Sequence, residues 1–293
     1  MTSEKKLKLG LSVVLCLLCV LIGRFLYQFY TDVKNVGTTK EMQDLSAAYQ
    51  ADKEIETALT VLQRGTTPAD VISSRPGRLV LVFDGLPGRA DTDRILKVLK
   101  QHDVKAVFFV EGQNAANEPE IMDHIRKAGH QIGNYTFYGS SHAEQLPQED
   151  LVTQLCRTQK ILATLTEFEP DYFRAPQTQF TPDLLKAVRA AGLKAAVQPG
   201  TIVNLWQIRS KADAEKAAAP LQAGMIVALE TGKPVTELPK KRKPAIDYNK
   251  LIDHKPTVKD HAAGGNEPDL KLSEKVDFLL TALEARGIKP TGL

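Results

Sequence analysis

Residues 81–87 read LVFDGLP, a short apolar run that reaches a carboxylate at Asp84 and turns at Gly85. With the two residues before it, the run forms LVLVF at 79–83, which has the length and composition of one buried strand. Comparable apolar runs recur at 106–110, 131–137, 172–176, 194–198, 224–230 and 288–293. The chain from residue 78 onward therefore predicts seven strands.

Amphipathic stretches separate these strands, and several end with a glycine just past the last helical turn, as at Gly129, Gly192 and Gly287. They cover 93–102, 118–129, 148–165, 181–192, 211–222 and 273–287. Repeated strand and helix units predict an α/β fold with a mostly parallel sheet, closed or nearly closed into a barrel. Chemistry in such barrels sits at the carboxyl ends of strands. The polar residues in those places are Asp84, Asn134, Tyr135, Arg174 and Glu230.

Five segments follow one another in a recognisable order: LVFDGLPG, AVFFVEGQN, IMDHIRKAGHQIGNYTF, DYFRAPQ and GMIVALE. In order and spacing, the chain from 78 to 293 resembles the polysaccharide deacetylase (NodB-homology) family, and KAGHQIGNYT is the most specific match. The resemblance implies the distorted (β/α)7 barrel of that family. It also implies a hydrolase ancestry in which a divalent metal such as zinc serves the removal of N-acetyl groups from carbohydrate.

The positions of the family's metal ligands hold no ligand in this chain. The family's first motif, T-F-D-D-G, provides a catalytic base and then a metal ligand, and this chain keeps Asp84 but has Gly85 in the second place. The second motif, H-[ST]-x-x-H, sets two imidazoles four residues apart so that both face one ion. Here those positions hold Tyr135 and Gly139. The resemblance therefore implies a degenerate member with no metal site and no cofactor.

The other motifs supply the residues expected around the site. The family's arginine that pairs with the base corresponds to Arg174, so Asp84 and Arg174, the expected catalytic residues, should form a charge-assisted hydrogen bond. The family's L-x-H motif provides a general acid, and Glu230 stands in its place. The residues expected to line the substrate groove are Asn134, Tyr135, Pro176, Gln177, Trp206 and Glu230.

Two functions from different classes follow from these replacements. Amide hydrolysis at neutral pH needs a strong nucleophile, which a bound metal supplies by lowering the pKa of a water to about 7. A lone carboxylate gives general acid–base help of about 10²–10⁴-fold, which falls short. The chain is therefore expected to be a pseudoenzyme that binds a cell-envelope glycan or a protein partner. The alternative is an active hydrolase that removes N-acetyl groups from a cell-envelope polysaccharide, with a relocated metal held by Asp84, His142 or Glu230.

The N-terminal residues predict a membrane anchor. Lys5, Lys6 and Lys8 precede an uncharged apolar run over 9–23, and a helix over 9–30 would measure about 33 Å, enough to span a bilayer. The basic residues favour a cytoplasmic tail over 1–8, a single-pass signal anchor over 9–30 and an extracytoplasmic C-terminal domain. A cleaved signal peptide is the alternative, although no small-x-small cleavage site follows the run.

One further segment precedes the expected barrel, and another lies between its last long strand and its final helix. A helical stalk or linker is expected over 31–77, because Thr38 and Glu41 have capping-box spacing and an apolar face continues to Gly65. Its helix is expected either to lean on the domain or to form a stalk, and it is too short and imperfect to favour a partner-binding coiled coil. A polar loop insertion rich in Pro and Lys is expected over 232–269, either as a solvated loop or as a cationic patch for anionic glycan or lipid. The net charge of +3 gives no reason to expect nucleic acid as a partner.

Overall fold

Strand β3 (Leu79–Asp84) lies in the middle of the sheet, and all of its residues are buried. The computed structural model describes residues 47–232 and 270–293. Within them β3 pairs in parallel with β4 (Val107–Val110) on one side and with β9 (Gly224–Glu230) on the other. The LVLVF run is therefore an interior strand with a parallel partner on each side.

Parallel pairing continues from β4 around the sheet. The next strands in order are β5 (Gln131–Asn134), β6 (Tyr172–Phe173), β7 (Ala195–Val197) and β1 (Asp70–Ile72). Strand β9 also pairs with β8 (Thr201–Asn204) in parallel and with β2 (Ser74–Arg75) in antiparallel orientation. The C-terminal strand β10 (Pro290–Thr291) pairs with the amino end of β3.

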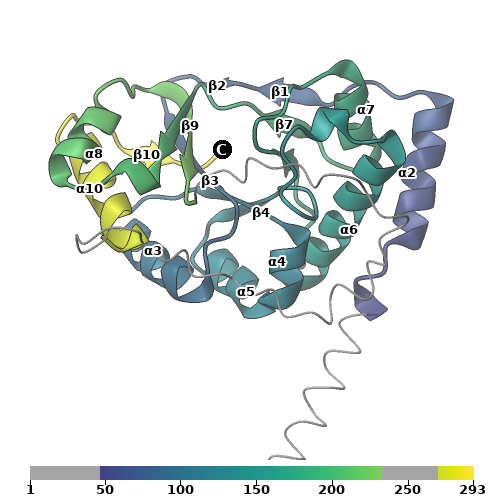
Figure 1. Cartoon of the computed structure of the whole chain (residues 1–293), viewed down its shortest axis with the longest axis horizontal. Helices are drawn as coiled ribbons and strands as arrows, with labels where there is room; N and C mark the ends of the chain where they lie inside the picture. The colour runs from purple at the N-terminus through teal and green to yellow at the C-terminus, as the bar shows by residue number, and fades with distance from the viewer. Residues whose placement is uncertain (1–46, 233–269) are drawn as a thin grey trace, which may run out of the picture. The chain divides into compact units, whose positions relative to one another are not determined.

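Two consecutive short strands bring the ends of this order together. Strand β1 pairs with β7, β2 pairs with β9, and only Ser73 separates β1 from β2 in the chain. Figure 1 shows β1 and β2 following one another along one side of the sheet. The sheet therefore curls into a nearly closed α/β barrel, as the repeated strand and helix units predicted.

Helices cover the outside of this barrel (Figure 1). Each helix packs on the next in the order α8, α10, α3, α5 and α6. Helix α6 also contacts α2 and α7. The bounds are α2 Asp52–Arg64, α3 Arg89–Gln101, α4 Gly112–Asn117, α5 Pro119–Lys127, α6 Gln148–Thr166, α7 Pro182–Ala190, α8 Lys211–Ala218 and α10 Leu272–Glu284, with 3-10 turns η1 Ala143–Gln145 and η2 Leu205–Gln207.

Local sequence explains where several helices begin. Helix α7 starts with Pro182, which has no N–H to leave unpaired, and the Thr181 side chain accepts the Leu184 N–H. Helix α8 is capped in the same way by Ser210, whose side chain accepts the Asp213 N–H. These starts agree with the expected helices at 181–192 and 211–222.

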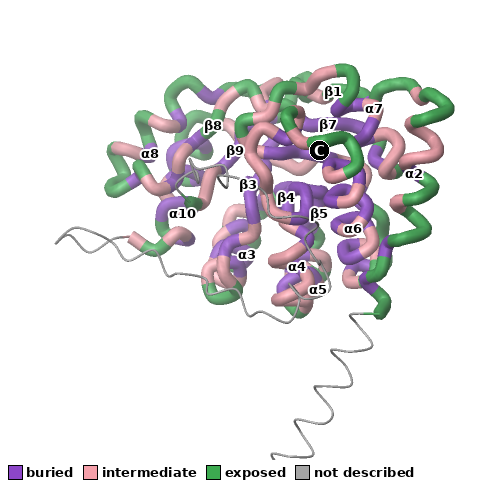
Figure 2. Tube along the Cα trace, turned by 45° about the vertical axis from the view of Figure 1, so that its right-hand side comes forward, coloured by how far each residue is buried: buried purple, intermediate pink, exposed green. Residues whose placement is uncertain are grey.

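Side chains along the strands alternate between the barrel interior and the helix layer, because successive residues of a strand point to opposite faces. One buried cluster gathers the inward-pointing residues Val80, Val82, Val107, Phe109, Tyr135, Val197, Ile226 and Ala228. Phe83 and Phe108, with the opposite parity, stack at 4.6 Å between ring centroids. Figure 2 shows β3 and β4 buried at the centre and much of α2 exposed.

The described part of the segment 31–77 packs against the barrel, as a helix leaning on the domain would. Residues 47–48 are helical, and helix α2 then begins at Asp52, an acid placed in the first turn where the helix dipole favours it. Ala58 is buried, and the apolar side of α2 packs on α6 and α7 through Ile55, Leu59 and Leu62. Together with β1 and β2, α2 therefore belongs to the barrel domain, whose sequence boundary was expected at 78.

Three expected segments lie outside the described residues. They are the anchor over 9–30, the start of the stalk helix at Thr38, and the polar loop over 232–269 beyond Gly232. Across 47–232 and 270–293, none of the helices combines the length and apolar character needed to cross a membrane. The predicted anchor stays a prediction.

Candidate functional site

Five polar side chains meet at the carboxyl ends of neighbouring strands. Asp84 ends β3, Glu230 ends β9, and Glu111, Tyr135 and Arg174 directly follow β4, β5 and β6. Asp84 and Glu230 are register partners on adjacent strands. Strand alternation puts Asp84 on the interior side of the sheet with Val82. The register between neighbouring strands places the other four residues at equivalent positions, so they belong to the same side.

Asp84 and Arg174 form a bidentate ion pair. Arg174 Nε donates to Asp84 Oδ1 at 2.6 Å, and Nη2 donates to Oδ2 at 2.6 Å. The side chains are only 1% and 7% exposed, so water barely screens the pair. Burial disfavours the charged guanidinium, but Asp84 outweighs this effect and raises the pKa of Arg174. The two residues expected to pair are thus held in one rigid geometry.

Glu111 places a second carboxyl at the same edge. Its Oε2 accepts the Leu86 N–H at 2.9 Å, which ties it to the loop after β3. Burial raises the pKa of Glu111, and the charge of Asp84 adds to the rise, whereas hydrogen bonds from Leu86 N–H and the Asn114 side chain oppose it. The site therefore contains a carboxyl that holds its proton more tightly than an exposed glutamate does.

Tyr135 and Glu230 complete the acidic side of the site. Tyr135 is 5% exposed, and burial together with the charge of Asp84 raises the pKa of its phenol well above 10.0. Burial and Asp84 also raise the pKa of Glu230. Burial and the charge of Asp84 thus raise the pKa of both Glu111 and Glu230, although Arg174 opposes the rise at Glu230.

The turn after β5 is fixed by Asn134 and Thr136. Asn134 is fully buried, and its Nδ2 donates to Leu155 O at 3.0 Å and to Gln159 Oε1 at 3.1 Å. Its Oδ1 accepts the Thr136 N–H at 2.9 Å, which supports Thr136 at the left-handed φ of 61°. Asn134, expected in the groove, instead points into the helix layer and positions the turn that carries Tyr135.

The other expected groove residues lie at the rim of the same edge. Pro176 is partly buried and Gln177 is exposed, both just beyond Arg174. Trp206 is partly buried in η2, which directly follows β8. Asn204, the last residue of β8 and the register partner of Glu230, is a rim residue that the sequence did not single out.

The residues present do not fit a divalent metal. Glycine at 85 and 139 offers no side-chain donor, and Tyr135 keeps its phenol proton far above neutral pH. Over the described ranges, no three His, Cys, Asp or Glu side chains are grouped to hold an ion. His142 instead lies 3.6 Å from Glu144, so Asp84, His142 and Glu230 do not assemble the relocated site.

Glu111 is the central residue that the sequence reasoning missed. The strand-end rule that singled out Asp84 also applies to Glu111, because it follows β4 and shares the parity of Val107 and Phe109. In the segment AVFFVEGQN the signal for Glu111 is its position two residues after Phe109, which places both side chains on the same face of the strand.

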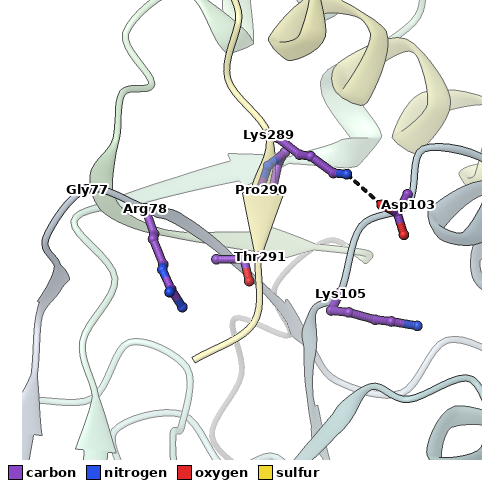
Figure 3. Close-up of a pocket in the computed structure, with 7 residues that line it drawn as sticks. All are labelled: Gly77, Arg78, Asp103, Lys105, Lys289, Pro290 and Thr291. Carbon is purple, nitrogen blue, oxygen red and sulfur yellow. Dashed lines mark hydrogen bonds and ion pairs between the residues drawn. The ribbon is translucent and has the colours of Figure 1, made fainter.

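A cavity of about 290 Å³ lies away from this site, at the amino ends of β3 and β4 (Figure 3). Lys289 Nζ donates to Asp103 Oδ2 at 2.6 Å, and Lys105 Nζ donates to Ala128 O at 2.6 Å. Two of its cations are thus already engaged, and it lies at the other end of β3 from Asp84. It is lined by Gly77, Arg78, Asp103, Lys105, Lys289, Pro290 and Thr291.

Comparisons with known sequences agree with this arrangement. The sequence profile of the polysaccharide deacetylase family matches residues 72–196. A chitooligosaccharide deacetylase from Bradyrhizobium is 33% identical over 159 residues, which are 54% of this chain and 72% of that protein. A peptidoglycan-N-acetylglucosamine deacetylase from Bacillus cereus is 36% identical over 108 residues, but these span only 37% of this chain and 39% of that enzyme.

Solved structures show the same fold. A CE4 family pseudoenzyme from Bacillus anthracis aligns with a TM-score of 0.56 at 19% identity, covering 78% of this chain and 68% of that one. A family 4 carbohydrate esterase from Streptomyces lividans aligns with a TM-score of 0.53 at 20% identity, covering 73% and 91%. With its distorted, nearly closed barrel and its match to these sequences, the chain belongs to the polysaccharide deacetylase family.

Proposed function

We propose that this chain is a catalytically degenerate polysaccharide deacetylase-like protein that binds an N-acetylated cell-envelope glycan without hydrolysing it. The observation that carries the proposal is the donor set: the three positions for metal ligands hold Gly85, Tyr135 and Gly139. A carboxyl, Glu111, lies among them with a raised pKa. These groups supply neither a metal-activated water nor a Lewis acid for the amide carbonyl.

The retained residues support binding rather than hydrolysis. The buried Asp84–Arg174 pair keeps the floor of the site rigid, and the partly exposed Glu230 carboxyl can form a hydrogen bond with a sugar hydroxyl. Trp206 and Gln177 at the rim offer an aromatic ring and an amide, both common partners of sugars. The relatives are named as deacetylases of peptidoglycan N-acetylglucosamine and of chitooligosaccharide, which supports the same class of ligand here.

The test combines a binding and an activity measurement on the same protein. Calorimetric titration with N-acetylglucosamine oligomers and with peptidoglycan fragments should show saturable binding. An acetate-release assay with the same glycans, with and without added zinc, should show no activity above the no-protein blank. Chelator-sensitive acetate release would contradict the proposal and favour the active hydrolase with a relocated metal.

A matched pair of variants locates the binding surface. Trp206→Ala should weaken glycan binding by about tenfold, the scale of one aromatic contact of about 1.4 kcal/mol. Gln207→Ala changes an exposed neighbour in the same 3-10 turn and should leave the affinity unchanged. Saturable binding of a protein but of no glycan would assign the groove to the protein partner instead.

We also propose that residues 9–30 anchor the chain in a membrane with the barrel outside the cytoplasm. The support is the basic-flanked apolar run and its length. Full-length protein should stay with the membrane fraction in alkaline carbonate, whereas a chain lacking residues 1–30 should be released. A mature N-terminus mapped after residue 30 would instead identify a cleaved signal peptide.

A further inference from the structure

Glu111 fills the space that the side chains of two missing metal ligands would need. A Cβ added at Gly85 would lie 2.8 Å from Glu111 Oε1, and a Cβ added at Gly139 would lie 3.0 Å from Glu111 Cγ. Gly85 follows β3 and Gly139 lies in the turn after β5, on either side of β4. One side chain that follows β4 thus occupies the room between both loops.

The Glu111 carboxyl is held in this place by contacts of its own. Its Oε2 accepts the Leu86 N–H at 2.9 Å, and the Asn114 side chain hydrogen-bonds to the same carboxyl. Although a glutamate side chain is flexible, moving this one away would break both contacts and leave the partly buried Leu86 N–H without its acceptor. A new side chain at Gly85 therefore meets a fixed obstacle.

The backbone at both glycines fits the same arrangement. Gly85 has φ +78° and Gly139 has φ +66°, in the left-handed region that side chains rarely adopt. Any residue with a Cβ placed there is strained before its side chain reaches Glu111. Both loops therefore have a backbone conformation that suits glycine and leaves room for the Glu111 side chain.

We infer that Glu111 has replaced the metal ligands as the group that organises the site: it positions the loop after β3 and the turn after β5, and it excludes a metal from the space between them. The three lost ligand positions are then only part of the reason that the site is degenerate. This inference rests on the geometry around Glu111 and needs no glycan, so its test is separate from that of the proposed function.

The test measures zinc binding by full-length variants. The first variant restores the family pattern with Gly85→Asp, Tyr135→His and Gly139→His. The second carries the same three changes together with Glu111→Ala. Competition against a chromophoric chelator should show that the second variant binds zinc at least about tenfold more tightly than the first.

A matched control separates space at the site from a general effect of removing a glutamate. Glu149 is exposed near the start of α6, and Glu149→Ala added to the three changes should leave zinc affinity equal to that of the first variant. Equal zinc affinity of the first and second variants would overturn the inference. Tighter binding by the first variant would overturn it too, because Glu111 would then be acting as a ligand.

A stability cycle covers the case in which a multiple variant fails to fold. Gly85→Asp, Glu111→Ala and the double variant are compared in urea unfolding. If Glu111 is the obstacle, Gly85→Asp should destabilise the protein more in the presence of Glu111 than in its absence. Additive effects of the two substitutions would contradict the inference.

Discussion

The Asp84–Arg174 pair gives a residue-scale prediction, because both side chains are almost fully buried. Arg174→Ala leaves the Asp84 carboxylate buried without its partner and should lower the free energy of unfolding by about 3–5 kcal/mol. Arg189→Ala is the control: Arg189 pairs with the exposed Asp70 at 3.4 Å, and its loss should cost less than about 1 kcal/mol. Urea unfolding measures both, and equal losses would argue against a structural role for the buried pair.

Glu111 gives a second residue-scale prediction, on pH. Burial raises its pKa above the ordinary value of 4.5, so the folded protein keeps a proton that the unfolded chain loses. Stability should therefore fall as the pH rises from 4.5 through the raised pKa. Glutamine cannot ionise, so the stability of Glu111→Gln should decrease less with rising pH than that of the parent protein. The decrease that remains is the part due to Glu230.

Unfolding free energies at several pH values between about 4 and 7 test the Glu111 prediction. Glu149→Gln, an exposed substitution of the same kind, should keep the full pH dependence of the parent protein. A Glu111→Gln curve parallel to that of the parent would mean that Glu111 ionises alike in the folded and unfolded states.

Sequence reasoning reached some site residues and not others for reasons of geometry. Asp84, Arg174 and Glu230 were accessible because a polar residue at the carboxyl end of an apolar run is conspicuous. Glu111 was not predicted as a site residue because none of the family motifs compared with this sequence includes its position. Asn134 was placed in the groove although strand alternation, combined with its neighbour Tyr135, directs one of the two outward.

At the scale of elements, His102 joins the end of α3 to α10. Its Nε2 lies 2.8 Å from Asp277 Oδ1, and its Nδ1 lies 2.8 Å from Glu284 Oε1. Burial works against the charged ring, but hydrogen bonds to both carboxylates outweigh it and raise the pKa of His102 above 6.5. The stabilisation is complete below pH 6.5 and is lost as the pH rises through the raised pKa.

His102→Gln should therefore lower the melting temperature at acidic pH and have a smaller effect at alkaline pH. Melting curves between about pH 5 and 9 measure this difference. His124→Gln serves as the control, since the His124–Asp93 pair is 39% and 38% exposed and should contribute little. A pH-independent loss in His102→Gln would show that packing, and not charge, links α3 with α10.

The elements that sequence could predict are those that carry their own pattern. The runs at 79–83 and 106–110 are apolar throughout, the run at 224–230 is apolar up to Glu230, and the three appear as β3, β4 and β9. Strands β1 and β8 went unpredicted because each is three or four residues long and partly exposed. Their strand character comes from pairing with β7 and β9, which is a property of the fold and not of the local sequence.

At the scale of the whole molecule, the position of the domain boundary can be tested by truncation. A chain that starts at Tyr49 keeps α2, β1 and β2, whereas one that starts at Arg78 loses them and uncovers Leu184 and Leu185 on α7. Several kcal/mol of lost burial should lower the melting temperature of the shorter chain by more than about 10 °C. Equal melting temperatures of the two chains would show that the segment before Arg78 does not stabilise the barrel, as expected of a linker.

The closure of the barrel through β1 and β2 also bears on the order of folding. Asp70 finds its register partner at Ala195 and Arg75 finds its partner at Gly224, so neither strand can pair until most of the barrel has been synthesised. Contacts this distant in sequence form slowly, because a long loop must close first. Strands β1 and β2 therefore join the sheet only after strands made much later, and during this delay the edge of β7 is open to pairing with another chain.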